Sequence, residues 1–323
     1  MRMGAADEIN KIKKYLWTTA KYGVSVLCLA YVFRGVPLGE MAAAMKLYPL
    51  APMFWVVGVS FAAYALMGLR LSVMSSPRLS FGSCFCATLA GLAINNILPA
   101  KAGEVAKALW LGRANSLPFQ KTLGIVFMER FFDVNVLALL SLWFLWTSGE
   151  KKIVFVFAAC ITVGWCVLVF FKLHPAWTDR FISLFGSEKF GTDGLKRFVS
   201  QALAGVLDNM SRGRLVWLSV ISLTTWCFYA TQMILSVNSV AGLNLSVSDA
   251  VVVFAVSGLG MLLPSSPGAI GVYEAFIVTI LKSYGVKPES ALALALFSHA
   301  AQFIPVTLAG GVACIFFPKG SQT

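Results

Sequence analysis

The sequence predicts an all-α polytopic membrane protein, and its composition is the first reason. Of the 323 residues, 58% are hydrophobic and only 12% are charged, and the mean hydropathy is +0.79. One water-soluble core cannot bury that much apolar surface. The second reason is that apolar runs of spanning length recur along the chain, since about 20 residues cross roughly 30 Å of hydrocarbon.

Six apolar runs predict about six full spans, and two further runs are broken. The six runs cover about 15–33, 49–69, 122–146, 152–171, 214–236 and 290–316. The broken runs cover about 80–114 and 250–281, and each contains a Leu-Pro-x-x-x-Gly step, which starts at Leu98 in the first and at Leu263 in the second. We expect two opposed re-entrant helical hairpins that form an inverted repeat and meet near the midplane, because paired breaks are typical of transport sites. Eight spans with broken helices are the alternative.

Lysine and arginine collect in two places, which predicts the orientation. A basic arm at 1–14 precedes the first span, and a basic amphipathic segment at 175–212 separates two later ones. The positive-inside rule makes both cytoplasmic, the second as an interfacial helical segment, and it also makes Arg70 cytoplasmic if the first broken run is a hairpin. An anionic leaflet explains the net charge of +12 without nucleic acid. We expect 1–323 to form a single integral-membrane domain.

The first break, from Asn95 to Glu104, predicts an anion-binding turn. Its proline removes a backbone donor and Gly103 permits a positive φ, so a new helix is expected to begin near Gly103. The free N–H groups and positive dipole end of that helix would lie beside Lys101, with Asn95 and Asn96 as further donors to phosphate oxygens. In the structural alternative, the asparagines only satisfy broken backbone and Lys101 pairs with Glu104.

Three charges lie within the apolar run that begins near residue 122. Glu129, Arg130 and Asp133 are expected at membrane depth, where charges usually face a bundle interior and mark a pathway or a paired network. Arg130 and Asp133 are three apart and can pair on one helix face. Glu129 and Asp133 repel each other unless a cation such as Lys101 or Lys107 lies between them. Purely structural pairing is the alternative.

The second break offers hydroxyls and glycines in place of a cation. Ser265, Ser266 and Gly268 are placed to bind a headgroup oxygen at a helix start, and Glu274 follows within an apolar run. His299 and Gln302, on the last span, are expected to face Glu274. Small polar residues are also common where membrane helices pack, which is the structural alternative for this tip.

Cofactor and metal chemistry find little support in the sequence. The seven cysteines fall in apolar stretches, where a thiol behaves as a small hydrophobe, and there are only two histidines. No Walker-type run provides ATP as the driving force. We therefore expect no cofactor, no metal site and no catalytic residue.

Two motifs carry a family resemblance. The first motif is Asn96-Ile-Leu-Pro-Ala-Lys-Ala-Gly103-Glu104, followed by Glu129-Arg130-x-x-Asp133. The second is Leu263-Pro-Ser-Ser-Pro-Gly-Ala-Ile-Gly-Val-Tyr-Glu274, with a later Ser298-His-x-x-Gln302 run. Together they resemble the lysylphosphatidylglycerol synthase transmembrane region, and the likeness covers residues 15–316 approximately. Lys101 stands where that motif often has Arg, which keeps the charge and loses the bidentate grip on phosphate.

The resemblance implies a flippase-like membrane domain. Members look like lipid translocases, some of them fused to a soluble aminoacyl transferase and others acting in glycolipid, glycan or hopanoid pathways. Because this sequence ends at Thr323, we expect no transferase domain and do not carry over the synthase activity. We expect the bacterial cytoplasmic (inner) membrane as the location.

The leading hypothesis is a lipid flippase for an anionic lipid, either a phospholipid or a polyprenyl-phosphate-linked glycolipid. Its partners would be membrane lipids with anionic headgroups, with a homo-oligomer or a pathway glycosyltransferase left open. One alternative is a headgroup-modifying enzyme, for which Glu129, Asp133 and His299 are the plausible pieces. The other is a non-transporting membrane partner in a lipid or glycan pathway.

Overall fold

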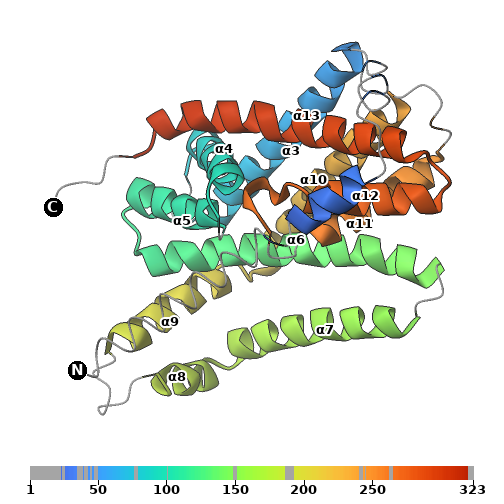
Figure 1. Cartoon of the computed structure of the whole chain (residues 1–323). Coiled ribbons are helices and arrows are strands. Elements are labelled where there is room, and N and C mark those ends of the chain that lie inside the picture. The colour runs from blue at the N-terminus through green and yellow to red at the C-terminus, as the bar shows by residue number, and fades with distance from the viewer. Residues whose placement is uncertain are drawn as a thin grey trace, which may run out of the picture. The chain divides into compact units, whose positions relative to one another are not determined.

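The computed structural model is built from helices (Figure 1). It describes residues 26–34, 50–75, 79–99, 101–147, 151–185, 193–239, 245–261 and 265–318, and single positions at 23, 39, 43, 46 and 243. The elements are α3 Leu50–Met74, α4 Phe81–Ile97, α5 Ala102–Asn115, α6 Phe119–Thr147, α7 Lys151–Leu173, α8 Pro175–Ser183, α9 Asp193–Leu207, α10 Arg212–Asn238, α11 Val247–Gly260, η2 Pro267–Ala269, α12 Val272–Ser283 and α13 Pro288–Ile315. Within these ranges no strand occurs, so the all-α prediction is confirmed.

The predicted spans coincide with the long helices. α3, α7, α10 and α13 contain apolar segments long enough to cross a membrane, at Ala51–Met74, Val154–Leu173, Arg212–Asn238 and Pro288–Ile315. The 29-residue α6 also exceeds the roughly 20 residues that crossing needs. Of the first predicted span, 15–33, the described residues 26–33 are helical. The basic arm at 1–14 lies outside the described residues.

Each broken run forms a pair of short helices. α4 and α5 have 17 and 14 residues, and α11 and α12 have 14 and 12. At 1.5 Å per residue, none of the four reaches across about 30 Å of hydrocarbon alone. Re-entrant hairpins and broken spans both use such helices. Leu263 and Pro264 of the second break lie outside the described residues.

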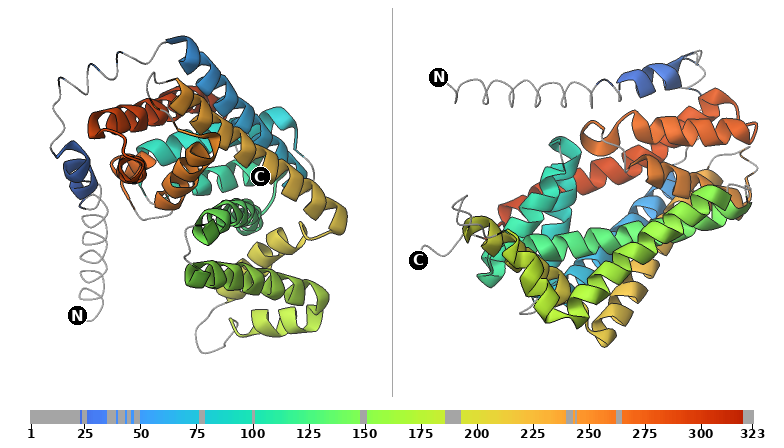
Figure 2. Two further views of the ribbon diagram at one scale, coloured as in Figure 1. Left: turned by 90° about the vertical axis from the view of Figure 1, so that its right-hand side faces the viewer. Right: turned by 90° about the horizontal axis from the view of Figure 1, so that it is seen from below.

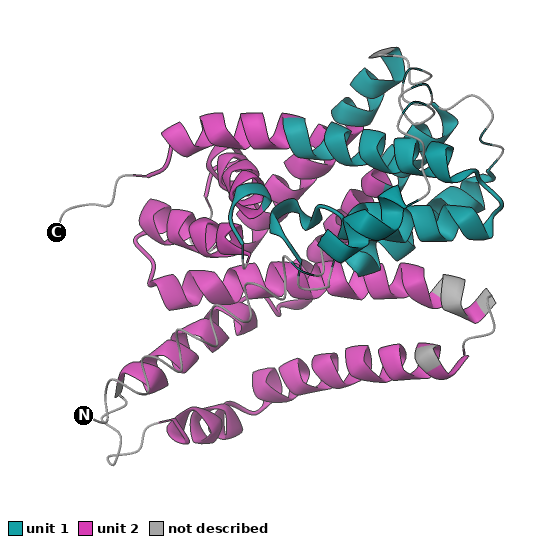
Figure 3. Ribbon diagram, viewed as in Figure 1, with its two compact units in different colours: residues 1–58, 96–100, 230–304 teal, residues 59–95, 101–229, 305–323 magenta. Residues whose placement is uncertain are grey.

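The chain divides into two compact units, which Figure 3 colours separately. Unit 1 comprises residues 1–58, 96–100 and 230–304, and unit 2 comprises 59–95, 101–229 and 305–323. The residues just before Lys101 in the first tip therefore belong to unit 1, together with the second tip. The remainder of α4 and α5 belongs to unit 2.

In unit 2, α6 is the central helix. It packs against α5 on one side and against α7 and α9 on the other (Figures 1 and 2). Glycines permit the contact with α9, because a Cβ on Gly205 would overlap the carbonyl oxygen of Lys121. The amphipathic segment at 175–212 is thus helical in α8 and α9, and α9 is held on α6 by packing and by the 2.8 Å ion pair between Lys121 and Asp208.

In unit 1, α11 and α12 pack on each other around the second break. A capping box fixes the start of α11, where the side chain of Ser246 accepts from the backbone of Asp249 and the carboxylate of Asp249 accepts in return. A small apolar cluster of Val56, Phe297 and Ala301 joins the start of α3 to α13. The second tip meets the middle of α13, where the carbonyl oxygen of Gly268 lies 3.0 Å from Nε2 of His299.

Candidate functional site

A cluster of six charged side chains lies inside unit 2, on α3, α5 and α6. Its members are Arg70, Glu104, Lys107, Glu129, Arg130 and Asp133. Arg70 bridges the two acids of α6, since Nη1 donates to Asp133 Oδ1 at 2.7 Å and Nη2 donates to Glu129 Oε1 at 3.2 Å. Three cations thus balance three carboxylates, which is the condition for keeping charges away from water.

Lys107 links the first hairpin to this cluster. Its Nζ lies 2.9 Å from Glu129 Oε2 and 3.6 Å from Glu104 Oε2. The prediction that a cation relieves the repulsion between Glu129 and Asp133 is therefore right in principle. Arg70 and Arg130 each touch both acids, while Lys107 touches only Glu129 of the two.

Arg130 forms the accessible face of the cluster. The predicted pair with Asp133 is confirmed at 3.1 Å, and the guanidinium also lies 3.2 Å from Glu129 and 3.6 Å from Glu104. Its side chain is 38% exposed, whereas those of Arg70 and Glu129 are fully buried. Nε and Nη2 of Arg130 make no hydrogen bond to the residues that the structure describes. Both atoms are buried and face carboxylates, with Nη2 3.2 Å from Glu129 and Nε 3.6 Å from Glu104, so the exposed part of Arg130 lies elsewhere on its side chain.

The first tip is closed by Asn95. Its Oδ1 accepts from the backbone N–H of Gly103 at 2.7 Å, and its Nδ2 donates to Glu104 Oε1 at 3.3 Å. Asn95 thus satisfies broken backbone, as the structural alternative for this tip expected, and it also bonds to Glu104 of the charged cluster. Asn96 donates to the carbonyl oxygen of Phe303 at 3.4 Å, so it too contacts backbone.

The helix after the first tip begins at Ala102, close to the predicted start. The prediction that Gly103 supplies the positive φ is wrong, because Lys101 adopts the left-handed conformation with φ 56° and Gly103 is already helical. Gly103 is needed instead because a Cβ there would overlap the carbonyl oxygen of Gly91 on α4. Lys101 is exposed at the N-cap, and its predicted pairing partner Glu104 lies within ion-pair distance of Lys107 and Arg130.

The second tip and α13 form a polar cluster inside unit 1. Glu274 contacts His299 as predicted, and its other oxygen accepts from the N–H of Gly271 at 2.7 Å. Gln302 does not reach Glu274; its Nε2 donates to Gln232 at 2.9 Å and to the hydroxyl of Tyr273 at 3.3 Å. The correction follows from helix geometry, because His299 and Gln302 are three apart and meet different neighbours along α13.

The glycine and the serines of this tip have separate roles. Gly268 adopts φ 66°, and a Cβ there would overlap the ring of Phe303. The hydroxyl of Ser266 donates to the carbonyl oxygen of Ile270 at 3.1 Å, within the turn. Ser265 is half-buried beside it. The backbone conformation of the tip thus depends on Gly268.

His299 joins Glu274 to the turn at Gly268. Nε2 of His299 lies 3.0 Å from the carbonyl oxygen of Gly268. Nδ1 of the same ring contacts Glu274 Oε1. One imidazole therefore links the start of α12 to the tip that precedes it.

Three residues of these clusters were missed as site residues in the sequence. Arg70 was interpreted as a cytoplasmic charge, but its side chain is fully buried. The feature that could have identified it is its position inside α3, four residues before the end of this helix. Gln232 is buried in the middle of an apolar helix, which is itself a signal of a polar partner. Tyr273 stands directly before Glu274 and gave no separate signal.

Comparisons with known proteins agree with these motifs. The family model of the lysylphosphatidylglycerol synthase TM region matches residues 19–310. Glycosyltransferase AglD of Haloferax volcanii is 27% identical in an alignment of 261 positions that covers 68% of this chain and 40% of that protein. The phosphatidylglycerol lysyltransferase of Staphylococcus haemolyticus is 28% identical over 116 residues, 36% of this chain and 14% of that protein.

A third relative is similar in extent to this chain. The UPF0104 membrane protein MJ1078 of Methanocaldococcus jannaschii is 24% identical over 229 residues, which cover 68% of this chain and 92% of that protein. By contrast, the chain spans well under half the length of the two relatives that are named as enzymes. With a family match over most of its length, apolar spanning helices and both tip motifs, this chain is a membrane protein that belongs to the lysylphosphatidylglycerol synthase transmembrane region family.

Proposed function

We propose that this protein translocates an anionic lipid between the leaflets of a bacterial inner membrane, and that it acts as a transporter and not as an enzyme. The lipid would be a phospholipid or a polyprenyl-phosphate-linked glycolipid. The observation that carries the proposal is the partly exposed side chain of Arg130, set against a buried and charge-balanced cluster within membrane helices. Charges at such depth are costly and usually mark a pathway.

Arg130 is suited to a phosphate because its side chain is the most exposed of the cluster, at 38%. A guanidinium carries five N–H donors, so it can bind a phosphate oxygen while it keeps its carboxylate partners. When a phosphate binds, Glu104 and Asp133 keep Lys107 and Arg70 as partners, at 3.6 and 2.7 Å. An anion can therefore approach Arg130 without leaving a buried carboxylate unpaired.

Lys101 supports the proposal as a second cation for the headgroup. It is exposed at the N-cap of α5, where the positive end of the helix dipole also favours anions. Asn95 uses its oxygen to fix the N–H of Gly103, so the turn is preorganised before any lipid arrives. The first tip and Arg130 would then bind the same headgroup in succession.

The second tip supports a change of state during transport. A proton shared by Glu274 and His299 would support the contact to the carbonyl of Gly268, and its loss would place a carboxylate against an imidazole lone pair. We propose that release of this proton loosens the tip and couples translocation to protons. Glu274, His299 and Gly268 would act as a unit.

The test is translocation of fluorescent phosphatidylglycerol in proteoliposomes, read by dithionite quenching of the outer leaflet. Lys101→Ala should slow translocation about tenfold, and Gly268→Leu should abolish it because of the positive φ and the ring of Phe303. Arg113→Ala is the matched control, since Arg113 lies at the other end of α5 and stacks on Phe317. Unchanged rates in both test variants would rule out the proposed sites.

A second candidate function is that of a membrane partner for an enzyme of a lipid or glycan pathway. It is favoured by the relatives named as a glycosyltransferase and as lysyltransferases, in which the matched segment is only 40% and 14% of the protein. Mass spectrometry of lipids from a deletion strain separates the two. A missing modified lipid indicates the partner role, whereas a normal lipid confined to one leaflet indicates transport.

A further inference from the structure

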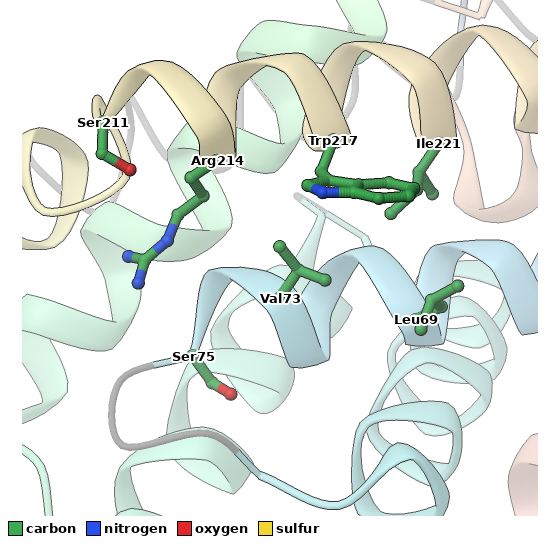
Figure 4. Close-up of a pocket in the computed structure, with 7 residues that line it drawn as sticks. All are labelled: Leu69, Val73, Ser75, Ser211, Arg214, Trp217 and Ile221. Atoms are coloured by element: carbon green, nitrogen blue, oxygen red, sulfur yellow. The ribbon is translucent and has the colours of Figure 1, made fainter.

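A groove of about 760 Å³ separates the end of α3 from the start of α10 within unit 2 (Figure 4). Its lining residues are Leu69, Val73, Ser75, Ser211, Arg214, Trp217 and Ile221. The two serines and the arginine gather at one end, and the indole of Trp217 extends over the apolar remainder. The volume falls within the range of small-molecule sites, about 300–1,000 Å³.

The apolar part of the groove belongs to membrane-spanning helices. Leu69 and Val73 are four apart on α3, and Trp217 and Ile221 are four apart on α10, so each helix presents one stripe. From Arg214 to Ile221 the groove extends about 10 Å along α10, roughly a third of the hydrocarbon thickness. Ser75 directly follows the span Ala51–Met74 and Arg214 is near the start of the span Arg212–Asn238, so the polar end lies near the membrane surface and the apolar stripes lie among acyl chains.

Arg214 brings a positive charge to this groove without an acidic partner. Nη1 donates to the carbonyl oxygen of Asp208 at 2.8 Å and lies 3.4 Å from Asn209 Oδ1, both neutral acceptors. The carboxylate of Asp208 is 2.8 Å from Lys121 instead. In the described ranges Arg214 makes no ion pair, so its charge is available to an anion.

The inner end of the groove has a fixed width. Arg70 and Ser222, which directly follow Leu69 and Ile221 in sequence, join α3 to α10 by a 2.9 Å hydrogen bond. At the outer end, Ser75 is held because its hydroxyl donates to the carbonyl of Ser72 and accepts from the N–H of Leu79. The groove is therefore preformed and does not require a ligand to open it.

We propose that this groove binds one anionic phospholipid of the surrounding bilayer, with its phosphate on Arg214 and an acyl chain along Val73, Trp217 and Ile221. Charge complementarity selects this occupant: a cation with only neutral partners caps an apolar groove inside a membrane. A neutral lipid would fill the groove and leave the guanidinium unpaired. The site is separate from the charged cluster and does not depend on lipid translocation.

Quenching of Trp217 by brominated lipids tests the proposal on the full chain in mixed-lipid vesicles. Subtracting the emission of a Trp217→Phe counterpart isolates this indole from the other tryptophans. Brominated phosphatidylglycerol should compete for the groove about fivefold better than brominated phosphatidylcholine, as one surface cation contributes about 1 kcal/mol. Arg214→Gln should abolish that preference and leave quenching by phosphatidylcholine unchanged.

The control variant is Arg212→Gln, which removes the same charge two residues away and outside the groove lining. It should keep the preference for phosphatidylglycerol. Equal loss of the preference in both variants would overturn the proposal in favour of general attraction to the membrane surface. No preference in the parent protein would also overturn it, because the groove would then not select an anionic lipid. Val73→Phe should fill the groove and reduce quenching by both lipids; unaltered quenching would mean that Trp217 meets only bulk lipid, which also overturns it.

Discussion

The guanidinium of Arg70 on α3 donates to Asp133 on α6 at 2.7 Å, across 63 positions of sequence. Arg70 is fully buried, and it also contacts Glu129 and Ser222. It therefore joins three helices of unit 2 through one side chain. Removing one partner from such a network leaves buried charge behind, which is more costly than never having built the network.

Arg70→Ala should consequently lower the free energy of unfolding by about 3–5 kcal/mol, because Glu129 and Asp133 lose the fully buried one of the two cations that they share. Denaturant or thermal unfolding in detergent measures the effect. The control is Arg113→Ala, an exposed arginine that should cost no more than about 0.5 kcal/mol. Similar stabilities for the two variants would show that Arg70 is not an essential part of the network.

Arg130→Lys should separate transport from stability. Lysine keeps the positive charge beside Asp133 but cannot grip two phosphate oxygens, so we expect translocation to fall about tenfold while unfolding changes by less than about 1 kcal/mol. The same assay on Arg180→Lys gives the reference, since Arg180 is exposed and stacks on Trp177. A full translocation rate in Arg130→Lys would mean that the guanidinium does not bind the headgroup.

Translocation should depend on the contact between His299 and Glu274. The imidazole joins this carboxylate to the carbonyl oxygen of Gly268, so a side chain that cannot make both contacts loosens the tip. His299→Gln should therefore lower the translocation rate in the proteoliposome assay. His174→Gln removes the other, exposed histidine and should retain the parent rate. A full parent rate in His299→Gln would contradict a role for this pair.

Gly103→Ala should destabilise the first hairpin by about 1–3 kcal/mol, because the added Cβ overlaps the Gly91 carbonyl and forces α4 and α5 apart. Gly58→Ala is the opposite case, since nothing lies within 4 Å of its added Cβ. It should stabilise α3 by about 0.5–1 kcal/mol by lowering the entropy of the unfolded chain. Thermal unfolding of both variants gives the comparison, and equal shifts would refute the close-approach argument.

Local relationships were readable from the sequence, and helix neighbourhoods were not. The pair between Arg130 and Asp133 follows from a spacing of three on one helix, and the short helices follow from the proline breaks. Arg70 and Asp133 belong to different helices, and which helices meet depends on how side chains interlock along their surfaces. The same holds for Gln232 and Gln302, which are 70 positions apart.

Misassigned details trace to the same cause. Gly103 was expected to supply a turn conformation, but a neighbouring backbone at Gly91, on another helix, is what excludes a side chain there. Lys101 adopts the left-handed conformation instead, which costs a non-glycine residue about 1–2 kcal/mol. Propensity alone therefore assigns the turn to the wrong residue.

The equality of cations and carboxylates in the unit 2 cluster has an electrical consequence. Because Arg70, Lys107 and Arg130 are already matched by Glu104, Glu129 and Asp133, the cluster has no surplus charge with which to neutralise a passing phosphate. A lipid anion that crosses here carries its own charge through the membrane field, which is worth about 2.3 kcal/mol per 100 mV. Under the proposed function, a potential that is negative inside drives such a lipid outward.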